Sequence, residues 1–201
     1  GGLATTTPDG TSGGAPAYIR DSGQYYDIET SYPSATPLRS SAGASADAKA
    51  VTLMKSFAEQ EAARFKDSSI GELTPERIQV ENLGGDRKYE LEAGYDMHES
   101  SVTVSYVYHM YANTLGAHPN AYYRTFTFDK ATGEALILHD LFATEDHLDV
   151  LSNETRKRLR TQIAEASSIP ESELDTTMLD AGTTPYADNF QNFYLEGSDL
   201  V

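Results

Sequence analysis

The residues whose types and spacing could do chemistry are concentrated in one segment between two aromatic, alternating stretches. It consists of Thr114, Leu115, Gly116, Ala117, His118, Pro119 and Asn120, with Tyr122 and Tyr123 directly after it. Glycine, proline and asparagine tolerate unusual backbone geometry, and tyrosine offers a large contact area at low entropic cost. Loops on rigid strands commonly carry binding. We therefore predict a recognition loop here; the alternative is a long hairpin in which Gly116 and Pro119 only fix the turn.

Catalytic chemistry finds little support in the sequence. Nucleophile-elbow, phosphate-loop, dinucleotide-binding, zinc-protease and EF-hand motifs are all missing. The sequence has 0 Cys, which excludes thiolate metal sites, iron–sulfur clusters and cysteine nucleophiles. His118 has no visible acid or nucleophile partner, so we assign no catalytic residue. Among 31 acidic residues some carboxylate pair will always be close, and a carbohydrate- or peptidoglycan-modifying hydrolase therefore stays as an alternative.

A metal site is also weakly supported. No two of the 5 histidines have the spacing of paired ligands on one helix face. One local cluster could hold a divalent ion; its members are His139, Asp140, Glu145, Asp146, His147 and Asp149. Acidic residues at the start of a helix are, however, expected from the helix dipole alone. The prediction is therefore no metal site and no cofactor.

The net charge restricts the class of partner. The chain has 15 Lys and Arg against 31 Asp and Glu, so its formal charge is 15 − 31 = −16. Nucleic acids and anionic membrane surfaces require clustered basic side chains and are excluded as partners. No Lys or Arg follows Arg160, whereas eight acidic residues do, and a cationic partner would be attracted there first. Those eight are Glu165, Glu171, Glu173, Asp175, Asp180, Asp188, Glu196 and Asp199.

The composition changes along the chain and predicts its organisation. Residues 1–17 are mostly Gly, Thr, Ser, Ala and Pro, which is typical of a flexible tether, or of a frayed terminus. We assign residues 18–86 to an N-terminal strand–helix module and residues 87–201 to a C-terminal domain, the two packed as one globule. No apolar run approaches the roughly 20 residues that a membrane span needs.

Hydrophobic periodicity predicts an α+β fold with an antiparallel or mixed sheet packed against two main helices. Strand-like alternation covers 24–32, 89–97, 102–110, 122–128 and 134–138. Helical spacing covers 47–66 and the segment after Thr144, which we expect to be the N-cap of the second helix. The segment 67–86, between the first helix and the strand at 89–97, is predicted to be a polar connection. The short spacing of the three central strands favours an antiparallel meander. A strand is also expected at 190–195, followed by a turn at 196–198 and the start of a partner strand.

The loop and its surroundings resemble a known family. The matching segments are Gly116-Ala117-His118-Pro119-Asn120, the aromatic strand 122–129, the turn Thr132-Gly133, and Leu138-His139-Asp140-Leu141-Phe142. Together they resemble the extracytoplasmic domain of RsiV-type anti-sigma factors. Upstream, the segments 25–28 and 32–33 and the helix with Phe57 and Phe65 resemble the companion module of that domain. The same pair occurs beside the catalytic domain of PdaC-type peptidoglycan deacetylases.

The resemblance implies a function. It implies a non-catalytic, extracytoplasmic bacterial binding domain, with a cationic protein such as lysozyme or cell-wall material as its partner. The transmembrane and sigma-binding segments of an anti-sigma factor and the deacetylase catalytic pattern are missing from this chain, so any anchor lies outside it. The resemblance further implies a strand beyond Val201, which we expect this chain to lack. A structural spacer without a ligand is the remaining alternative.

Overall fold

The computed structural model describes residues 14–39 and 42–201, so most of the predicted tether lies outside the described residues. The described chain divides into two compact units. Unit 1 contains the described residues up to Ala135 together with Tyr194–Val201, and unit 2 is Leu136–Phe193. No helix in the described part is both long and apolar enough to cross a membrane.

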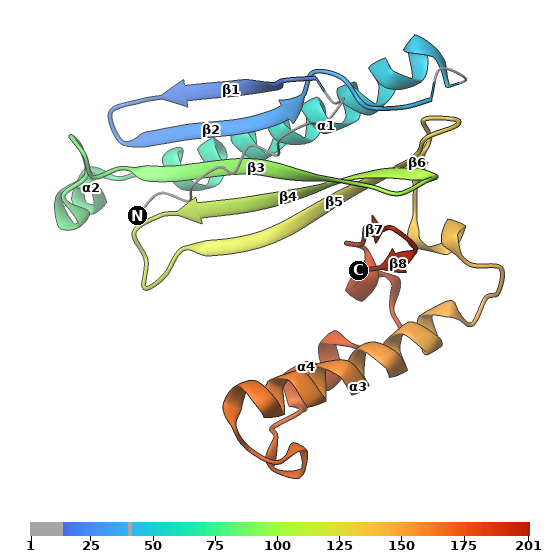
Figure 1. Ribbon diagram of the computed structural model, residues 1–201. Coiled ribbons are helices and arrows are strands. Elements are labelled where there is room, and N and C mark those ends of the chain that lie inside the picture. Colours follow the sequence, from blue (N-terminus) through green and yellow to red (C-terminus); the bar gives the residue numbers. More distant parts are fainter. Residues whose placement is uncertain (1–13, 40–41) are drawn as a thin grey trace. The chain divides into compact units, whose positions relative to one another are not determined.

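A mixed six-stranded sheet forms the body of unit 1 (Figure 1) and confirms the predicted α+β class. Its strands, in spatial order, are β1 (Pro16–Ser22), β2 (Tyr26–Pro33), β3 (Tyr89–Glu99), β4 (Thr103–Asn113), β5 (Asn120–Asp129) and β6 (Ala135–Leu136). The three central strands form the predicted antiparallel meander. β2 and β3 are parallel, because the long connection between them allows a crossover through helices.

The strand boundaries differ from the predicted domain boundaries. β1 begins at Pro16, so the last two residues of the predicted tether belong to a strand. Strands from both sides of residue 86 share one sheet, and the division into units falls instead after Ala135 and before Tyr194.

The helix α1 (Gly43–Phe65) covers one face of the sheet and lies behind β1 and β2 in Figure 1. Met54 and Ala58, one turn apart, are fully buried, and the Phe57 ring meets those of Tyr108 and Phe126, each with 5.2 Å between centroids. Alternate residues of β2 to β5 complete this core, as the period-two patterns predict. The opposite face of the sheet, called the outer face below, carries the other alternate set.

The segment predicted as a polar connection contains helical structure, so that prediction was wrong. A π-helical turn (Lys66–Ile70) continues α1, and α2 (Pro75–Glu81) follows it. The Thr74 hydroxyl caps α2 by accepting the Arg77 N–H at 3.2 Å, and Asn82 ends the helix in the left-handed region with φ 52°. Threonine followed by proline is a recognised helix start that a search for apolar periodicity misses.

Unit 2 contains α3 (His147–Ser167) and α4 (Thr177–Gly182), with 3₁₀ turns at Leu138–Leu141, Glu171–Glu173 and Ala187–Phe190. Thr144 is not the N-cap of α3, because Asp146 occupies that position. A salt-bridge cluster joins the two helices: Asp180 Oδ1 lies 3.2 Å from Arg156 Nε and 3.1 Å from Arg160 Nη2.

The predicted C-terminal turn and partner strand are present, but the strand before them begins later than predicted. Phe190 ends a 3₁₀ turn, and the short hairpin of β7 (Leu195–Glu196) and β8 (Asp199–Leu200) comes later. β7 contacts β3 and β4, and the Tyr194 ring lies 4.2 Å from that of His98. The hairpin therefore covers part of the outer face near the end of β3.

Candidate binding surface

The predicted recognition loop connects β4 to β5. Residues 116–120 are exposed, and His118 Nδ1 lies 3.2 Å from the carbonyl oxygen of Pro119. Leu115 is in the left-handed region, with φ 57°, where a leucine is rare. Its N–H donates to Asn113 Oδ1 at 2.9 Å, and its side chain packs against the core of unit 1. The loop is therefore anchored at Leu115 and open to solvent beyond it.

The two tyrosines that follow the loop do not act together, because neighbouring residues of a strand point to opposite faces. Tyr122 faces α1 and donates its hydroxyl hydrogen to Glu61 Oε2 at 2.9 Å. Burial, and then this bond to Glu61, raise the pKa of Tyr122 to about 12. Tyr123 is 59% exposed on the outer face, beside His109. Tyr123 is thus the more exposed of the two, while Tyr122, 37% exposed, is engaged with Glu61.

Strand register aligns the outer-face side chains in rows across the sheet. The first row consists of Ser22, Asp27, Glu90 and Asn113, and the second of Arg20, Glu29, Glu92 and Tyr111. The third row consists of Gly94, His109 and Tyr123. We call the first two the acidic rows and the third the aromatic row.

The acidic rows place carboxylates directly opposite one another on parallel strands, Asp27 beside Glu90 and Glu29 beside Glu92. Like charges directly opposite one another on neighbouring strands destabilise a sheet. The β2 member of each pair has a cation: Lys88 Nζ lies 3.1 Å from Asp27 Oδ1, and Arg20 Nε lies 2.6 Å from Glu29 Oε2. The side chains of Glu90 and Glu92 form no ion pair or hydrogen bond with any described residue.

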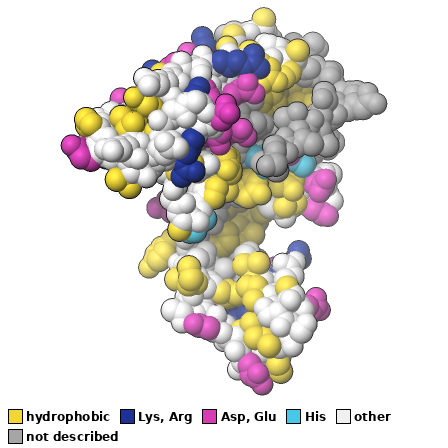
Figure 2. Space-filling view, turned by 90° about the vertical axis from the view of Figure 1, so that its left-hand side faces the viewer, with side chains coloured by type: hydrophobic (Ala, Val, Ile, Leu, Met, Phe, Trp, Pro, Cys, Tyr) yellow, Lys and Arg dark blue, Asp and Glu magenta, His cyan; other side chains and the backbone are white. Residues whose placement is uncertain are grey.

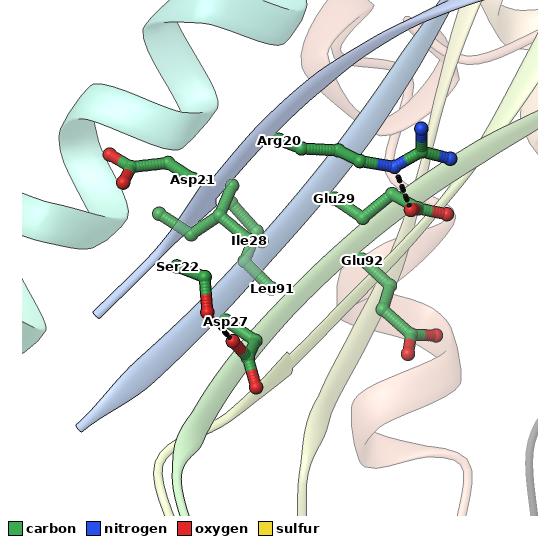
Figure 3. Close-up of a pocket in the computed structure, with 8 residues that line it drawn as sticks. All are labelled: Arg20, Asp21, Ser22, Asp27, Ile28, Glu29, Leu91 and Glu92. Carbon is green, nitrogen blue, oxygen red and sulfur yellow. Dashed lines mark hydrogen bonds and ion pairs between the residues drawn. The ribbon is translucent and has the colours of Figure 1, made fainter. Parts of the chain in front are cut away.

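A hollow of ≈350 Å³ lies at these rows, between β1, β2 and β3 (Figure 3). Arg20, Glu29 and Glu92 point to one side of the strands there, whereas Asp21 points to the other side, where Lys66 Nζ lies 2.6 Å from it. The Ser22 hydroxyl, and after it Lys88, lower the pKa of Asp27, which therefore keeps its charge in mildly acidic solution. The hollow opens toward unpaired negative charge.

The aromatic row combines a histidine–carboxylate contact with exposed rings. His109 Nε2 lies 2.7 Å from Asp96 Oδ2, and the rings of His109 and Tyr123 meet edge to face at 5.0 Å. Opposite His109, Gly94 leaves open space, since a Cβ atom there would meet nothing within 4 Å. No described serine or threonine forms a hydrogen bond with His109, so the pair has no visible nucleophile.

A second hollow lies where β3 begins and β4 ends. It has a volume of ≈520 Å³ and is lined by Asn82, Gly84, Asp86, Arg87, Lys88, Glu90, Asn113 and Leu115. Figure 2 views the molecule from this end and shows acidic and basic side chains next to one another on unit 1. Because Leu115 belongs to the predicted loop, we call this the loop hollow. It joins that loop to the first acidic row through Glu90 and Asn113.

In the cluster of acidic residues and histidines at 139–149, the two histidine rings pack against each other, and one of them packs against Phe142. His147 is buried, its ring stacks on Phe142, and the rings of His139 and His147 lie 5.1 Å apart. His147 Nδ1 lies 3.1 Å from the carbonyl oxygen of Thr144. Within the described ranges, no three His, Cys, Asp or Glu side chains are grouped so that they could hold a metal ion.

Comparisons with known proteins return structural neighbours only. No protein-family model and no curated protein sequence matches the chain. A DUF3298 family member from Bacteroides fragilis has a TM-score of 0.47 and 14% identity, with 90% of this chain and 78% of that chain covered. A DUF3298 family protein from Pseudomonas aeruginosa has a TM-score of 0.41 and 12% identity, with 75% and 68% covered. Both neighbours thus come from a family named for a domain of unknown function, and similarity at this level carries no argument about activity.

Proposed function

We propose that this chain is a non-catalytic, extracytoplasmic binding domain that takes a cationic protein, such as lysozyme, on the outer face of its sheet and the adjoining loop. The observation that carries the proposal is the pair of acidic rows. The side chains of two glutamates, Glu90 and Glu92, have no partner among the described residues and stand beside two further carboxylates on the face of the sheet opposite α1. The resemblance to RsiV-type ectodomains supports lysozyme as the first partner to test.

The acidic rows have a cost that binding would remove. Each like-charge pair destabilises the free domain, and a positive group from a partner would convert the repulsion into attraction. The rest of the chain adds to this effect, since its net charge of −16 steers any cationic partner toward the domain. Association should therefore be fast at low ionic strength and should weaken as salt rises.

The aromatic row and the loop supply contact area next to this charge. Tyr123 is 59% exposed, and residues 116–120 of the loop are exposed as well. Tyrosine side chains are common anchors in protein interfaces because they bury a large area at little entropic cost. The proposal thus assigns steering to the carboxylates and contact to Tyr123 and the loop.

The experiment is a titration of lysozyme with the domain at low and high salt, with both binding and muramidase activity measured. We expect salt-sensitive association, inhibition of the enzyme, and weaker binding for Glu92→Gln. The same variant should be slightly more stable than the unchanged chain, because it removes one like-charge pair. Glu134→Gln is the matched control, since it removes the same charge from an exposed residue in the turn at the far end of β5.

Two results would count against the proposal. Unchanged lysozyme kinetics at low salt with excess domain would exclude lysozyme as the partner. Equal losses for Glu92→Gln and Glu134→Gln would mean that only net charge matters and that the acidic rows are not the surface. His118→Ala and Asn120→Ala test the loop, because a structural spacer predicts no binding loss for either.

The hydrolase alternative has one structural feature to consider, the close contact of Asp96 and His109 on the same face. A turnover assay on soluble peptidoglycan fragments addresses it directly. Turnover that is lost in His109→Ala would replace the binding proposal with an enzymatic one.

A further inference from the structure

A single glycine in the middle of β3 carries a more specific inference about the partner. Gly94 lies on the outer face, between Glu92 and Asp96 along the strand and opposite His109 of β4. We propose that the partner makes its closest approach to the sheet at Gly94, so that a side chain at this position excludes it. This proposal rests on the proposed function, and the partner is therefore the same cationic protein.

Glycine is an unfavourable residue in the interior of a strand. It loses more conformational freedom on folding than any other residue, and it contributes no side chain to the packing of the sheet. Gly94 is the sixth of the 11 residues of β3, so it does not lie at a frayed end of the strand. A glycine at such a position therefore needs a reason, either in the fold or in binding.

The usual structural reasons for a glycine in a strand do not apply to Gly94. It is not among the described glycines with positive φ. The pairing of β3 with β4 runs one to one from Glu90 to Glu99, so this fully described stretch contains no bulge. A Cβ atom built on Gly94 meets no described atom within 4 Å. The described part of the fold thus has room for a side chain here.

The side chain opposite Gly94 leaves the space above it open. An aromatic ring on a neighbouring strand can cover a glycine and compensate for its missing side chain. Here, however, His109 Nε2 lies 2.7 Å from Asp96 Oδ2, and its ring meets that of Tyr123 on β5. These two contacts hold the imidazole to the side. The space is therefore already formed in the free domain, and a partner need not order these side chains in order to enter it.

Two features of β3 bring a bound protein to this point. β2 pairs with β3 only as far as Thr30 and Ala93, so from Gly94 onward β4 is the only described strand paired with β3. Glu92, the preceding outer-face residue, lines the hollow at the acidic rows (Figure 3). A protein seated in that hollow therefore meets bare backbone next along the strand. Close approach of a ligand or of another backbone is the remaining reason for a glycine inside a strand.

The experiment adds side chains of increasing size at Gly94 and measures stability and binding in the same variants. Gly94→Ala should raise the melting temperature of the free chain by about 1–4 °C, because it removes the entropic cost of glycine. Gly94→Thr introduces a residue favoured in strands and should be at least as stable. Both should bind lysozyme more weakly at low salt, Gly94→Ala by about tenfold and Gly94→Thr by more, because the added atoms occupy the contact.

Gly182→Ala is the matched control. Gly182 ends α4 in unit 2, is not among the described glycines with positive φ, and leaves a built Cβ atom without a described neighbour within 4 Å. The change adds the same methyl group outside the sheet and should leave lysozyme binding unchanged. The Gly94 amide provides a second readout, because lysozyme should shift its signal in the spectrum of the unchanged, ¹⁵N-labelled chain.

Opposite signs for stability and binding distinguish a contact residue from a structural glycine. A lower melting temperature in both Gly94 variants would mean that the sheet itself requires glycine there, for example for its curvature, and would overturn the inference. Full affinity in both variants would overturn it as well. So would a Gly94 amide signal that stays in place while the signals of residues 116–120 shift.

The same measurements separate this inference from the proposed function. If lysozyme binds the unchanged chain and both Gly94 variants equally and in a salt-sensitive manner, the binding domain stands and the approach at Gly94 is wrong. If lysozyme binds none of them, the proposed function fails for lysozyme, and the inference that rests on it fails too.

Discussion

Two tyrosine hydroxyls in the core of unit 1 provide a direct test of how this fold is held together. Tyr106 and Tyr108 are 1% and 0% exposed, and their hydroxyl oxygens have no hydrogen-bond partner among the described residues. Both rings pack against Tyr95, with centroids 5.4 and 5.5 Å away. Burial raises the pKa of both hydroxyls above the ordinary tyrosine value. Each hydroxyl is therefore removed from water without gaining a hydrogen bond from the described residues.

Replacing either residue by phenylalanine should therefore stabilise the protein. The change removes only the oxygen atom and leaves the ring packing in place. An unpaired buried polar group costs about 1–3 kcal/mol, so we expect Tyr106→Phe and Tyr108→Phe each to recover up to that amount. For a chain of this length, each kcal/mol corresponds to a rise of about 2–4 °C in the melting temperature.

Tyr89→Phe is the matched control, because it removes the same atom from a hydroxyl that has a partner. The Tyr89 hydroxyl donates to Glu81 Oε2 at 2.6 Å, and its ring is also fully buried. A hydrogen bond to a charged group contributes about 1.5–3 kcal/mol, so this variant should lose stability by that amount. Urea unfolding of the three variants, with the midpoints compared at an unchanged slope, measures the difference.

The sign of the stability change shows whether the two hydroxyls lack partners in solution. If Tyr106→Phe and Tyr108→Phe lose as much stability as Tyr89→Phe, the hydroxyls of Tyr106 and Tyr108 have hydrogen-bond partners in solution, and the core contains no unpaired hydroxyl at these positions. An unchanged midpoint for both would mean that the cost of burial is met by internal water.

Three further predictions concern the same unit. Gly133→Ala should destabilise the chain by about 1–3 kcal/mol in thermal unfolding, since Gly133 has φ 74° and a Cβ atom would lie 2.5 Å from that of Ala46. Stability should decline above pH 10, because burial raises the pKa of Tyr95 to about 12, so the Tyr95 hydroxyl ionises at lower pH in the unfolded chain than in the folded one. A titration followed by phenolate absorbance, together with urea midpoints at the same pH values, measures this. At acid pH the dependence of stability on pH is opposite for Glu81, whose pKa is lowered, first by the Tyr89 hydroxyl. Its contribution to stability is present above pH 4.5 and is lost as pH falls through the lower folded pKa. In a plot of urea midpoint against pH, Glu81→Gln should therefore reduce the slope on the acid side.

Much of unit 1 could be predicted from local patterns. The central strands and α1 follow from period-two and helical spacing, because each buries one continuous face. The missed elements lack such a face: α2 contains 7 residues with none buried, and β1 is an edge strand that alternates only between exposed and half-buried positions. The strand predicted at 190–195 begins later, at Leu195, because a short aromatic run packs equally well without strand geometry.

The candidate surface was predicted less completely than the fold. The loop could be located because its composition contrasts with that of the strands beside it. Glu90 and Glu92 were missed, although their alternation with Tyr89 and Leu91 places them on the outer face of a strand. What made them notable is their pairing with Asp27 and Glu29, which lie more than 60 positions earlier in the chain. No local pattern contains that information.

The sequence by itself determined the net charge, the class of fold, the face on which each strand residue lies and the position of the loop. These properties depend on composition and on local backbone geometry, which alternates side chains whatever the neighbouring strand is. Only the tertiary structure decided which strands are neighbours and in which register. That choice brought four carboxylates together and left Glu90 and Glu92 without a cation among the described residues, because strand pairing is set by the burial of the core face as a whole rather than by any one segment.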